Sequence, residues 1–184
     1  MSVIMIKNAR LSFPDIWTPK AFFEGQAPKF SCSLLLDKEL HKAQIVSFKK
    51  TIKEAALAGF NGVIPAGLKI CLNDGNEKSY DGYENAMYIR CASRLRPQII
   101  DRDRTPLVEE DGRPYAGCYV NAAVSLWIQD HNLGGKRVAC NINALQFVKD
   151  GETFGAGGIK TETVFDDISS EQDADVEAED DFLS

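Results

Sequence analysis

The chain has 184 residues, of which 44% are hydrophobic, and it carries a formal net charge of −6 at pH 7. This length is enough for one domain with a substantial core, and no stretch approaches the roughly 20 apolar residues that a membrane helix needs. The N-terminal segment has neither the basic start nor the cleavage site of a secretory signal, so we expect a cytoplasmic protein that contacts no membrane.

The first third of the chain predicts two strands. Val3–Phe13 is rich in Val, Ile and Phe, which favours a strand. The prolines that follow predict a loop over Asp15–Ala27, which contains three aromatic residues. Lys29–Leu36 then alternates, with Phe30 and every second residue after it on one face.

A helix is predicted after the second strand. Asp37 is placed to act as its N-cap, and Gly59 to end it. Its lysines are expected on the solvated face. The apolar stripe at helical spacing consists of Leu40, Ala43, Ile45, Val46, Ile52, Ala55, Ala56 and Leu57.

The second half of the chain predicts three longer strands. These are Met87–Arg96, Cys118–Ile128 and Lys136–Val148, each with alternating apolar residues. In the third, Val138, Cys140, Ile142 and Ala144 are expected to face inward. Between the first two lies a polar segment, Asp101–Pro114, in which Asp111-Gly112 predicts a hairpin turn. The glycine-rich stretch from 151 to 158 is expected to end the folded part.

About five strands and one helix, with no βαβ repeat, predict a mainly β fold. Strands of this length need closure or a second layer to remove their edges. The count fits a five-stranded OB-fold Greek-key barrel with long loops, and a small sandwich is the main alternative. We expect residues 1–158 to form the domain and residues 159–184 to form a flexible acidic tail.

The outward faces of these strands combine basic and aromatic side chains. Unpaired bases stack on aromatic rings. Arginine forms ion pairs with phosphates and cation–π contacts with rings. This pattern predicts a surface for single-stranded nucleic acid. Its candidate residues are Lys29, Tyr88, Arg90, Arg94, Arg96, Tyr119, Asn121, Trp127 and Arg137.

Purely structural roles for these side chains stay open. Tyr119 or Trp127 can instead pack under the helix or the loop, and the three arginines can pair with acids of Asp101–Asp111. Those acids resemble a metal-dependent nuclease site, but arginines are interspersed among them. The five cysteines are widely spaced without a Cys-x-x-Cys pair and predict reduced core residues rather than a zinc site. No catalytic set, metal site or cofactor is expected.

The last nineteen residues, from Asp166, hold nine carboxylates and no Lys or Arg. The first 165 residues therefore hold the other 18 acids against all 21 bases, a balance of +3. A run of like charge stays solvated and often acts as an interaction tail. Asp180, Asp181 and Phe182 are the candidate partner-binding residues, because a purely solubilising tail needs no apolar tip.

The sequence resembles the single-stranded-DNA-binding proteins of tailed bacteriophages, in particular a family of OB-fold DNA binders. The resemblance rests on several stretches that occur in the same order and span nearly all of residues 3 to 158. They are Asn8–Phe13, Pro28–Leu36, Ile64-Pro65, Leu72–Gly75, Gly117–Val120 and Asn141–Gln146 before Asp150-Gly151, with a tail ending in Asp180-Asp181-Phe182 and two further residues.

The resemblance implies a non-enzymatic protein that binds single-stranded DNA without sequence preference during phage replication or recombination, in the host cytoplasm. It also implies a tail that contacts replication enzymes. Two other classes stay open: a metal-dependent nuclease using Asp101, Asp103 and Glu109, and a module that binds only protein. A strand-annealing protein is a close variant of the preferred hypothesis.

Overall fold

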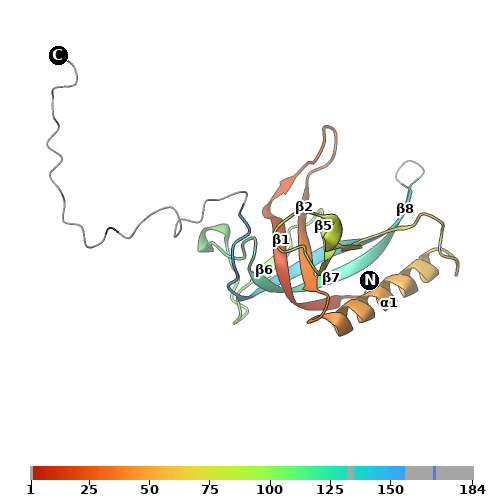
Figure 1. The fold of residues 1–184 in the computed structure, drawn as a ribbon. Helices are drawn as coiled ribbons and strands as arrows, with labels where there is room; N and C mark the ends of the chain where they lie inside the picture. The colour runs from red at the N-terminus through yellow and green to blue at the C-terminus, as the bar shows by residue number, and fades with distance from the viewer. Residues whose placement is uncertain (1, 132–134, 156–167, 169–184) are drawn as a thin grey trace, which may run out of the picture. The chain divides into compact units, whose positions relative to one another are not determined.

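A computed structural model describes residues 2–131, 135–155 and 168, which form an eight-stranded sheet and one α-helix (Figure 1). The first compact unit, Met1–Phe154, contains all of these elements, and the second is Gly155–Ser184. The elements are β1 (Ile4–Lys20), β2 (Lys29–Asp37), α1 (Lys42–Gly59), β3 (Lys69–Ile70), β4 (Leu72–Asp74), β5 (Ala86–Ser93), β6 (Gln98–Ile100), β7 (Tyr119–His131) and β8 (Gly135–Lys149), with short 3-10 helices at Gly75–Glu77 and Glu109–Asp111.

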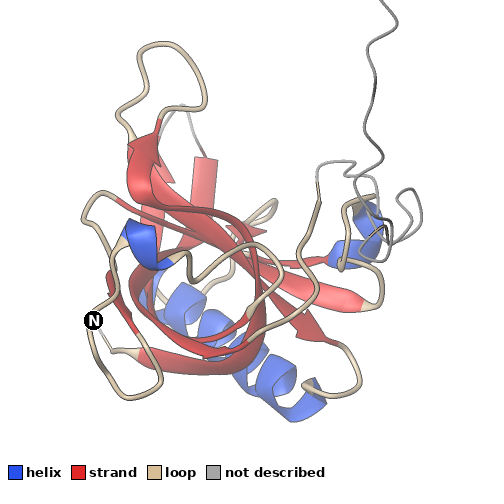
Figure 2. Cartoon of the chain, turned by 90° about the vertical axis from the view of Figure 1, so that its left-hand side faces the viewer, coloured by secondary structure: helices blue, strands red, loops and turns tan. Residues whose placement is uncertain are grey.

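The sheet curls into a nearly closed barrel (Figure 2). Its strand order is β3-β8-β7-β1-β2-β5-β4, and β6 pairs with β8. The two end strands, β3 and β4, are separated only by Cys71. β3 pairs in parallel with β8, whereas β4 pairs antiparallel with β5. One segment, residues 69–74, therefore bridges the two ends of the sheet, and we call this place the seam.

The prediction of a mainly β barrel with one helix is confirmed, although the count of five strands omitted three short ones. β3, β4 and β6 have two or three residues each. A strand of that length is too short to show an alternating pattern in the sequence. These strands are defined by their pairing with β8 and β5, which only the folded chain displays.

The barrel interior is filled by the inward residues of the long strands. Val120, Ala122 and Val124 of β7 are fully buried, as are Leu34 and Leu36 of β2. In β8 the alternation changes at Asn143, because Ala123 pairs with Ala144 but Val124 pairs with Ile142. Such a bulge moves the following side chains to the opposite face.

The β8 bulge corrects the predicted inward set of that strand. Leu145 and Phe147 are buried in the core, whereas Ala144, which was expected inside, is half-buried on the other face. No residue type in the sequence marks this bulge, because Asn143 is an ordinary outward residue of an alternating strand.

The first strand is longer than predicted. β1 continues past Pro14 and Pro19 to Lys20, so residues 15–20 are not a loop. The register to β2 shifts between Ser12 and Asp15, and Phe13 has a φ of 46°. A strand tolerates proline where it is bulged or lies at an edge. The result is an arm, the hairpin of β1 and β2, whose tip projects beyond the barrel (Figure 1).

The helix packs one narrow stripe against the barrel. Ile45, Phe48, Ile52 and Ala56 are its buried residues, at the expected spacing of three or four. Leu40 and Val46 were expected in the stripe but are 84% and 60% exposed, because Leu40 precedes the helix and Val46 lies about 100° round from Ile45. Within the part of the chain that the structure describes, no helix is both long and apolar enough to cross a membrane.

The helix ends at Gly59 as predicted, whereas Asp37 and Gly112 have roles other than the predicted ones. The Oδ1 atom of Asp37 accepts the backbone N–H groups of Leu40 and Glu39, both at 2.9 Å, and these bonds lower the pKa of Asp37. Asp37 therefore stabilises the turn before α1, and His41 occupies the N-cap position. Gly112, expected in a hairpin turn, instead ends a 3-10 helix with a φ of 71°.

Replacing Phe48 with alanine is predicted to destabilise the fold by about 3–5 kcal/mol, because the ring is fully buried between α1 and the barrel. The control on the same helix is Val46→Ala, for which a change within about 0.5 kcal/mol is expected. Urea denaturation followed by tryptophan fluorescence measures both. Equal losses for the two variants would contradict the packing described here.

Candidate nucleic-acid interface

A groove with a volume of about 1010 Å³ lies over the seam. Its walls come from β5 on one side, from β7 and β8 on the other, and from residues 68–71 and Asn73 at the bridging segment. Lys29 at the start of β2 also lines it. Five cations line the groove: Lys29, Lys69, Arg90, Arg94 and Arg137. None of the described residues that line it is Asp or Glu.

The groove cations have no carboxylate partner among residues 2–131 and 135–155. The ion pairs found there join Lys20 to Asp15, Lys38 to Asp74 and Arg113 to Asp101. The alternative in which the arginines pair with the acids of the 101–111 segment therefore does not hold for Arg90, Arg94 or Arg96. Several like charges that face one concavity focus a positive potential on it.

The groove also offers flat apolar surfaces. Trp127 of β7 and Tyr88 of β5 both line it. The Tyr88 ring packs against that of Tyr83, with ring centroids 5.2 Å apart. Ala92 of β5 and Ala139 of β8 also line the groove, and their small side chains leave room in it. Such a surface suits a ligand that has planar groups to stack on the rings and a negatively charged backbone to contact the cations.

The arm adds aromatic residues that the sequence placed only in a loop. Phe22 and Phe23 lie at its tip and are 55% and 65% exposed. The guanidinium of Arg90 lies 5.7 Å from the centroid of the Phe22 ring, which places this tip beside the groove. The only sequence signal for this is the density of aromatic residues between prolines, which says nothing about where a loop folds back.

Six of the nine predicted contact residues line the groove together. They are Lys29, Tyr88, Arg90, Arg94, Trp127 and Arg137. They come from β2, β5, β7, β8 and the segment after β5, which are brought together by the barrel. Outward-facing positions in the strand pattern therefore predict most of the residues of this one surface.

The other three predicted residues, Tyr119, Asn121 and Arg96, do not line it. Arg96 lies over Trp17 of β1, 5.0 Å from the ring centroid. The Asn121 side chain accepts from the Asn8 backbone N–H at 3.0 Å and donates to Gln146 at 3.2 Å, so it holds neighbouring strands together.

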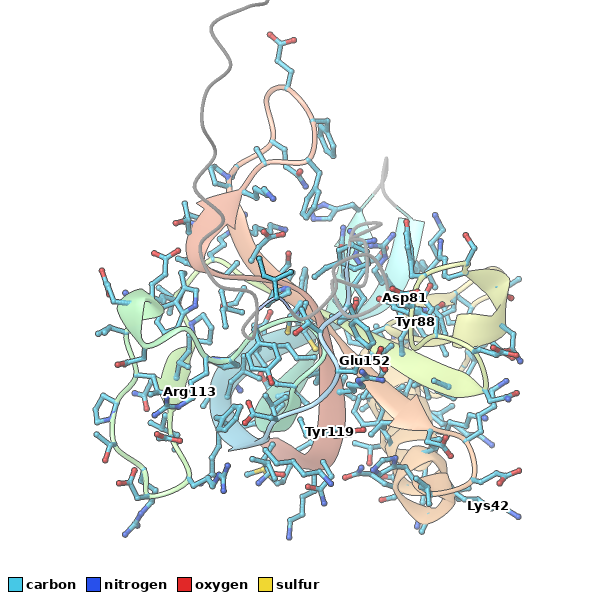
Figure 3. The ribbon with its side chains drawn as sticks, turned by 60° about the vertical axis from the view of Figure 1, so that its left-hand side comes forward. Lys42, Asp81, Tyr88, Arg113, Tyr119 and Glu152 are labelled. Carbon is cyan, nitrogen blue, oxygen red and sulfur yellow. The ribbon has the colours of Figure 1, made fainter. Side chains whose placement is uncertain are left out.

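Tyr119 belongs to another flank of the barrel (Figure 3). Its ring lies 4.7 Å from Lys149 Nζ and 5.8 Å from the Arg10 guanidinium carbon. Eight residues of strand separate it from Trp127, a length of about 26 Å. Because the sheet curves over that length, two residues on the same side of β7 face different parts of the surface.

The end of the first compact unit is fixed by Arg10. This side chain donates to the Glu152 carbonyl at 2.6 Å and to the Gly117 carbonyl at 3.0 Å, and it lies 4.2 Å from the Phe154 ring centroid. The Phe154 ring occupies the space that a Cβ on Gly82 would need. The predicted tail residues Asp180, Asp181 and Phe182 lie outside the described residues.

The acidic segment 101–111 uses its carboxylates to hold its own turns. Asp101 pairs with Arg113, which lowers the pKa of Asp101. Asp103 accepts from the Thr105 N–H and Asp111 from the Val108 N–H. In the described ranges, no group of three or more His, Cys, Asp or Glu residues is arranged to hold a metal ion. The carboxylates that a metal-dependent nuclease would need do not converge.

Comparison with known proteins gives one family and several structural matches. The model of the family described as "Enterobacter phage Enc34, ssDNA-binding protein" matches residues 1–182. Protein p50 of Acyrthosiphon pisum secondary endosymbiont phage 1 is 35% identical over 181 residues, which cover 94% of this chain and 97% of p50.

Two solved structures define the fold match. The single-stranded DNA-binding protein of bacteriophage Enc34, in complex with ssDNA, has a TM-score of 0.75 at 27% identity, covering 83% of this chain and 89% of that one. Gp2.5, a single-stranded DNA binding protein encoded by bacteriophage T7, matches with a TM-score of 0.57 at 11% identity over 87% of this chain and 98% of that one. The second match concerns the fold alone.

Proposed function

The chain belongs to the family of the Enterobacter phage Enc34 ssDNA-binding protein, and we propose that it binds single-stranded DNA, without sequence preference, in the groove over the seam. The activity of this family is non-enzymatic, as expected from the sequence. The observation that carries the proposal is a groove lined by five cations, Trp127 and Tyr88. The described residues provide no carboxylate in its lining and no ion pair to its cations.

The groove chemistry favours contact with the DNA backbone over reading of base edges. Lysine and arginine neutralise phosphates wherever they occur along a strand. Stacking on Trp127 and Tyr88 accepts every base, because every base has a π-face. The side-chain amides of Gln129 and Asn141 line the groove and can donate or accept with any base. Asn73 also lines it, and because its Nδ2 donates to the Ile70 and Cys71 carbonyls, its Oδ1 is the atom that can accept. A strand bound in this way is held without regard to its sequence.

The arm is proposed to flank the bound strand. Phe22 lies beside Arg90, which lines the groove, so the arm tip can add one more ring to the stacking surface. Its exposed aromatic residues otherwise present broad apolar rings to water.

The acidic tail is proposed to have two roles. Its nine carboxylates can compete with phosphates for the same cations, and its end, Asp180 to Phe182, can recruit replication or recombination proteins in the host cytoplasm. These roles require the tail to be separable from the binding domain, which we propose to be residues 1–158. The basic balance of the first 165 residues supports the competition.

Trp127→Ala is predicted to weaken binding of oligothymidine by roughly 1–3 kcal/mol, because a stacking platform is lost. The control is Tyr119→Ala, which removes an outward aromatic of the same strand that does not line the groove and is expected to leave affinity unchanged. Fluorescence anisotropy of a labelled oligonucleotide measures both. The reverse order of effects would move the interface to the other flank of the barrel.

Arg137→Gln is predicted to lower the steepness of the salt dependence of binding. The slope of log K against log [salt] is expected to fall in magnitude by about 0.7, because one phosphate contact is lost. Arg104→Gln, an exposed arginine outside the groove, is the matched control with an unchanged slope. If neither the native chain nor the Arg104→Gln control shifted the mobility of DNA at low salt, the result would favour the alternative of a module that binds only protein.

Deleting Asp166–Ser184 is predicted to tighten DNA binding at low salt, because a competing polyanion is removed. A full-length variant with the nine tail carboxylates changed to amides serves as the matched control, since it keeps the tail length. It is expected to behave like the deletion. Equal affinities of the native chain and both variants would show that the tail does not compete for the groove.

A further inference from the structure

Four of the five cysteines meet at the seam. Cys32 of β2 is the cross-strand partner of Cys91 of β5. The sulfur of Cys91 lies 3.7 Å from that of Cys140 on β8. Cys71, the residue between β3 and β4, shares a hydrogen bond with Cys140. The fifth cysteine, Cys118, is separate and accepts from the Tyr115 backbone N–H.

This thiol cluster lies where the barrel has no direct strand pairing. β5 and β8 are not neighbours in the strand order, and between them lies only the bridging segment. The Cys91–Cys140 contact therefore joins the two strands across the seam. Cys91 is fully buried, and Cys140 is only 3% exposed, but Cys140 and Cys71 belong to the lining of the groove.

The environment of Cys140 favours its reaction first. Hydrogen bonds from the thiols of Cys71 and Cys91 lower the pKa of Cys140, whereas hydrogen bonding to Cys140 and burial raise the pKa of Cys91. The thiolate is the form that attacks an oxidant. Because Cys140 belongs to the groove lining and Cys91 does not, an oxidant in the groove meets Cys140 first, and Cys91, whose sulfur lies 3.7 Å away, is placed to act as the resolving thiol.

We propose that Cys91 and Cys140 form a reversible disulfide that locks the barrel seam when the protein meets a peroxide. Cys140 attacks one peroxide oxygen and becomes a sulfenic acid, releasing one water from H₂O₂. The Cys91 sulfur then displaces the sulfenic hydroxyl, which leaves as a second water. The two thiols lose two electrons and two protons together, and H₂O₂ is reduced to two waters.

A disulfide has an S–S distance of about 2.05 Å, so the two sulfurs must approach by about 1.7 Å. In a reducing cytosol both thiols stay free. A reductant such as dithiothreitol reverses the bond by thiol–disulfide exchange.

The groove is the route by which an oxidant reaches Cys140. If the proposed function is correct, a bound strand covers that route, and oxidation slows. The state of the thiols then differs between free and DNA-bound protein. This second step rests on the proposed function, whereas formation of the disulfide does not.

The test treats the full chain with H₂O₂, then unfolds it, alkylates the free thiols and counts them by mass spectrometry. We expect five alkylated cysteines in the reduced protein, three after oxidation, and five again after dithiothreitol. Peptide mapping should join Cys91 to Cys140 within one chain. Cys91→Ser and Cys140→Ala should each abolish this bond, and Cys118→Ser, the matched control, should keep it.

Five free thiols after oxidation, a bond to Cys71 or Cys32, or a bond between chains would overturn the proposal. Repeating the oxidation with saturating oligothymidine tests the groove route. Binding is checked in the same sample by anisotropy. Slower oxidation with DNA bound supports the groove as the route of the oxidant. An unchanged rate with DNA bound overturns this route but leaves the Cys91–Cys140 disulfide standing. Failure of the DNA to bind would instead count against the proposed function.

Discussion

Closure of the barrel by residues 69–74 is the constraint on which the rest of the structure depends. This segment pairs first with β8 and then with β5, changing partner at Cys71. The Arg90 backbone N–H donates to the Cys71 carbonyl at 2.9 Å, which joins the turning point to β5. β8 and β5 are therefore held near each other without a continuous ladder between them. That arrangement creates both the groove above the seam and the thiol contact beneath it.

Within residues 2–131 and 135–155, the positive charge of the groove is not compensated by any ion pair. Five cations face one concavity, and the described residues provide no carboxylate to pair with them. Acids are available nearby in the sequence, yet Asp101, Asp103 and Asp111 are engaged in their own turns. Like charges gathered in this way repel each other, and the repulsion is relieved when a polyanion enters. The repulsion between the groove cations therefore links the stability of the domain to its affinity for a polyanion.

The sequence predicted the fold class and most of the proposed interface, and its failures have specific physical causes. Alternation correctly placed Tyr88, Arg90, Trp127 and Arg137 outside, because those strands are regular there. It failed after Asn143, where one extra residue reverses the faces.

Curvature and three-dimensional proximity account for the remaining differences. Sharing an outward face did not bring Tyr119 and Trp127 to one site, because the sheet bends between them. The position of Phe22 beside Arg90, and the convergence of four cysteines from distant segments, arise only when the barrel closes. In the proposed mode of binding, five cations attract any dense negative charge, and stacking on each of the two lining rings adds roughly 1–3 kcal/mol for a base. The competition proposed for the acidic tail does not require the tail to resemble a base, because the tail needs to match only the electrostatic part of this binding.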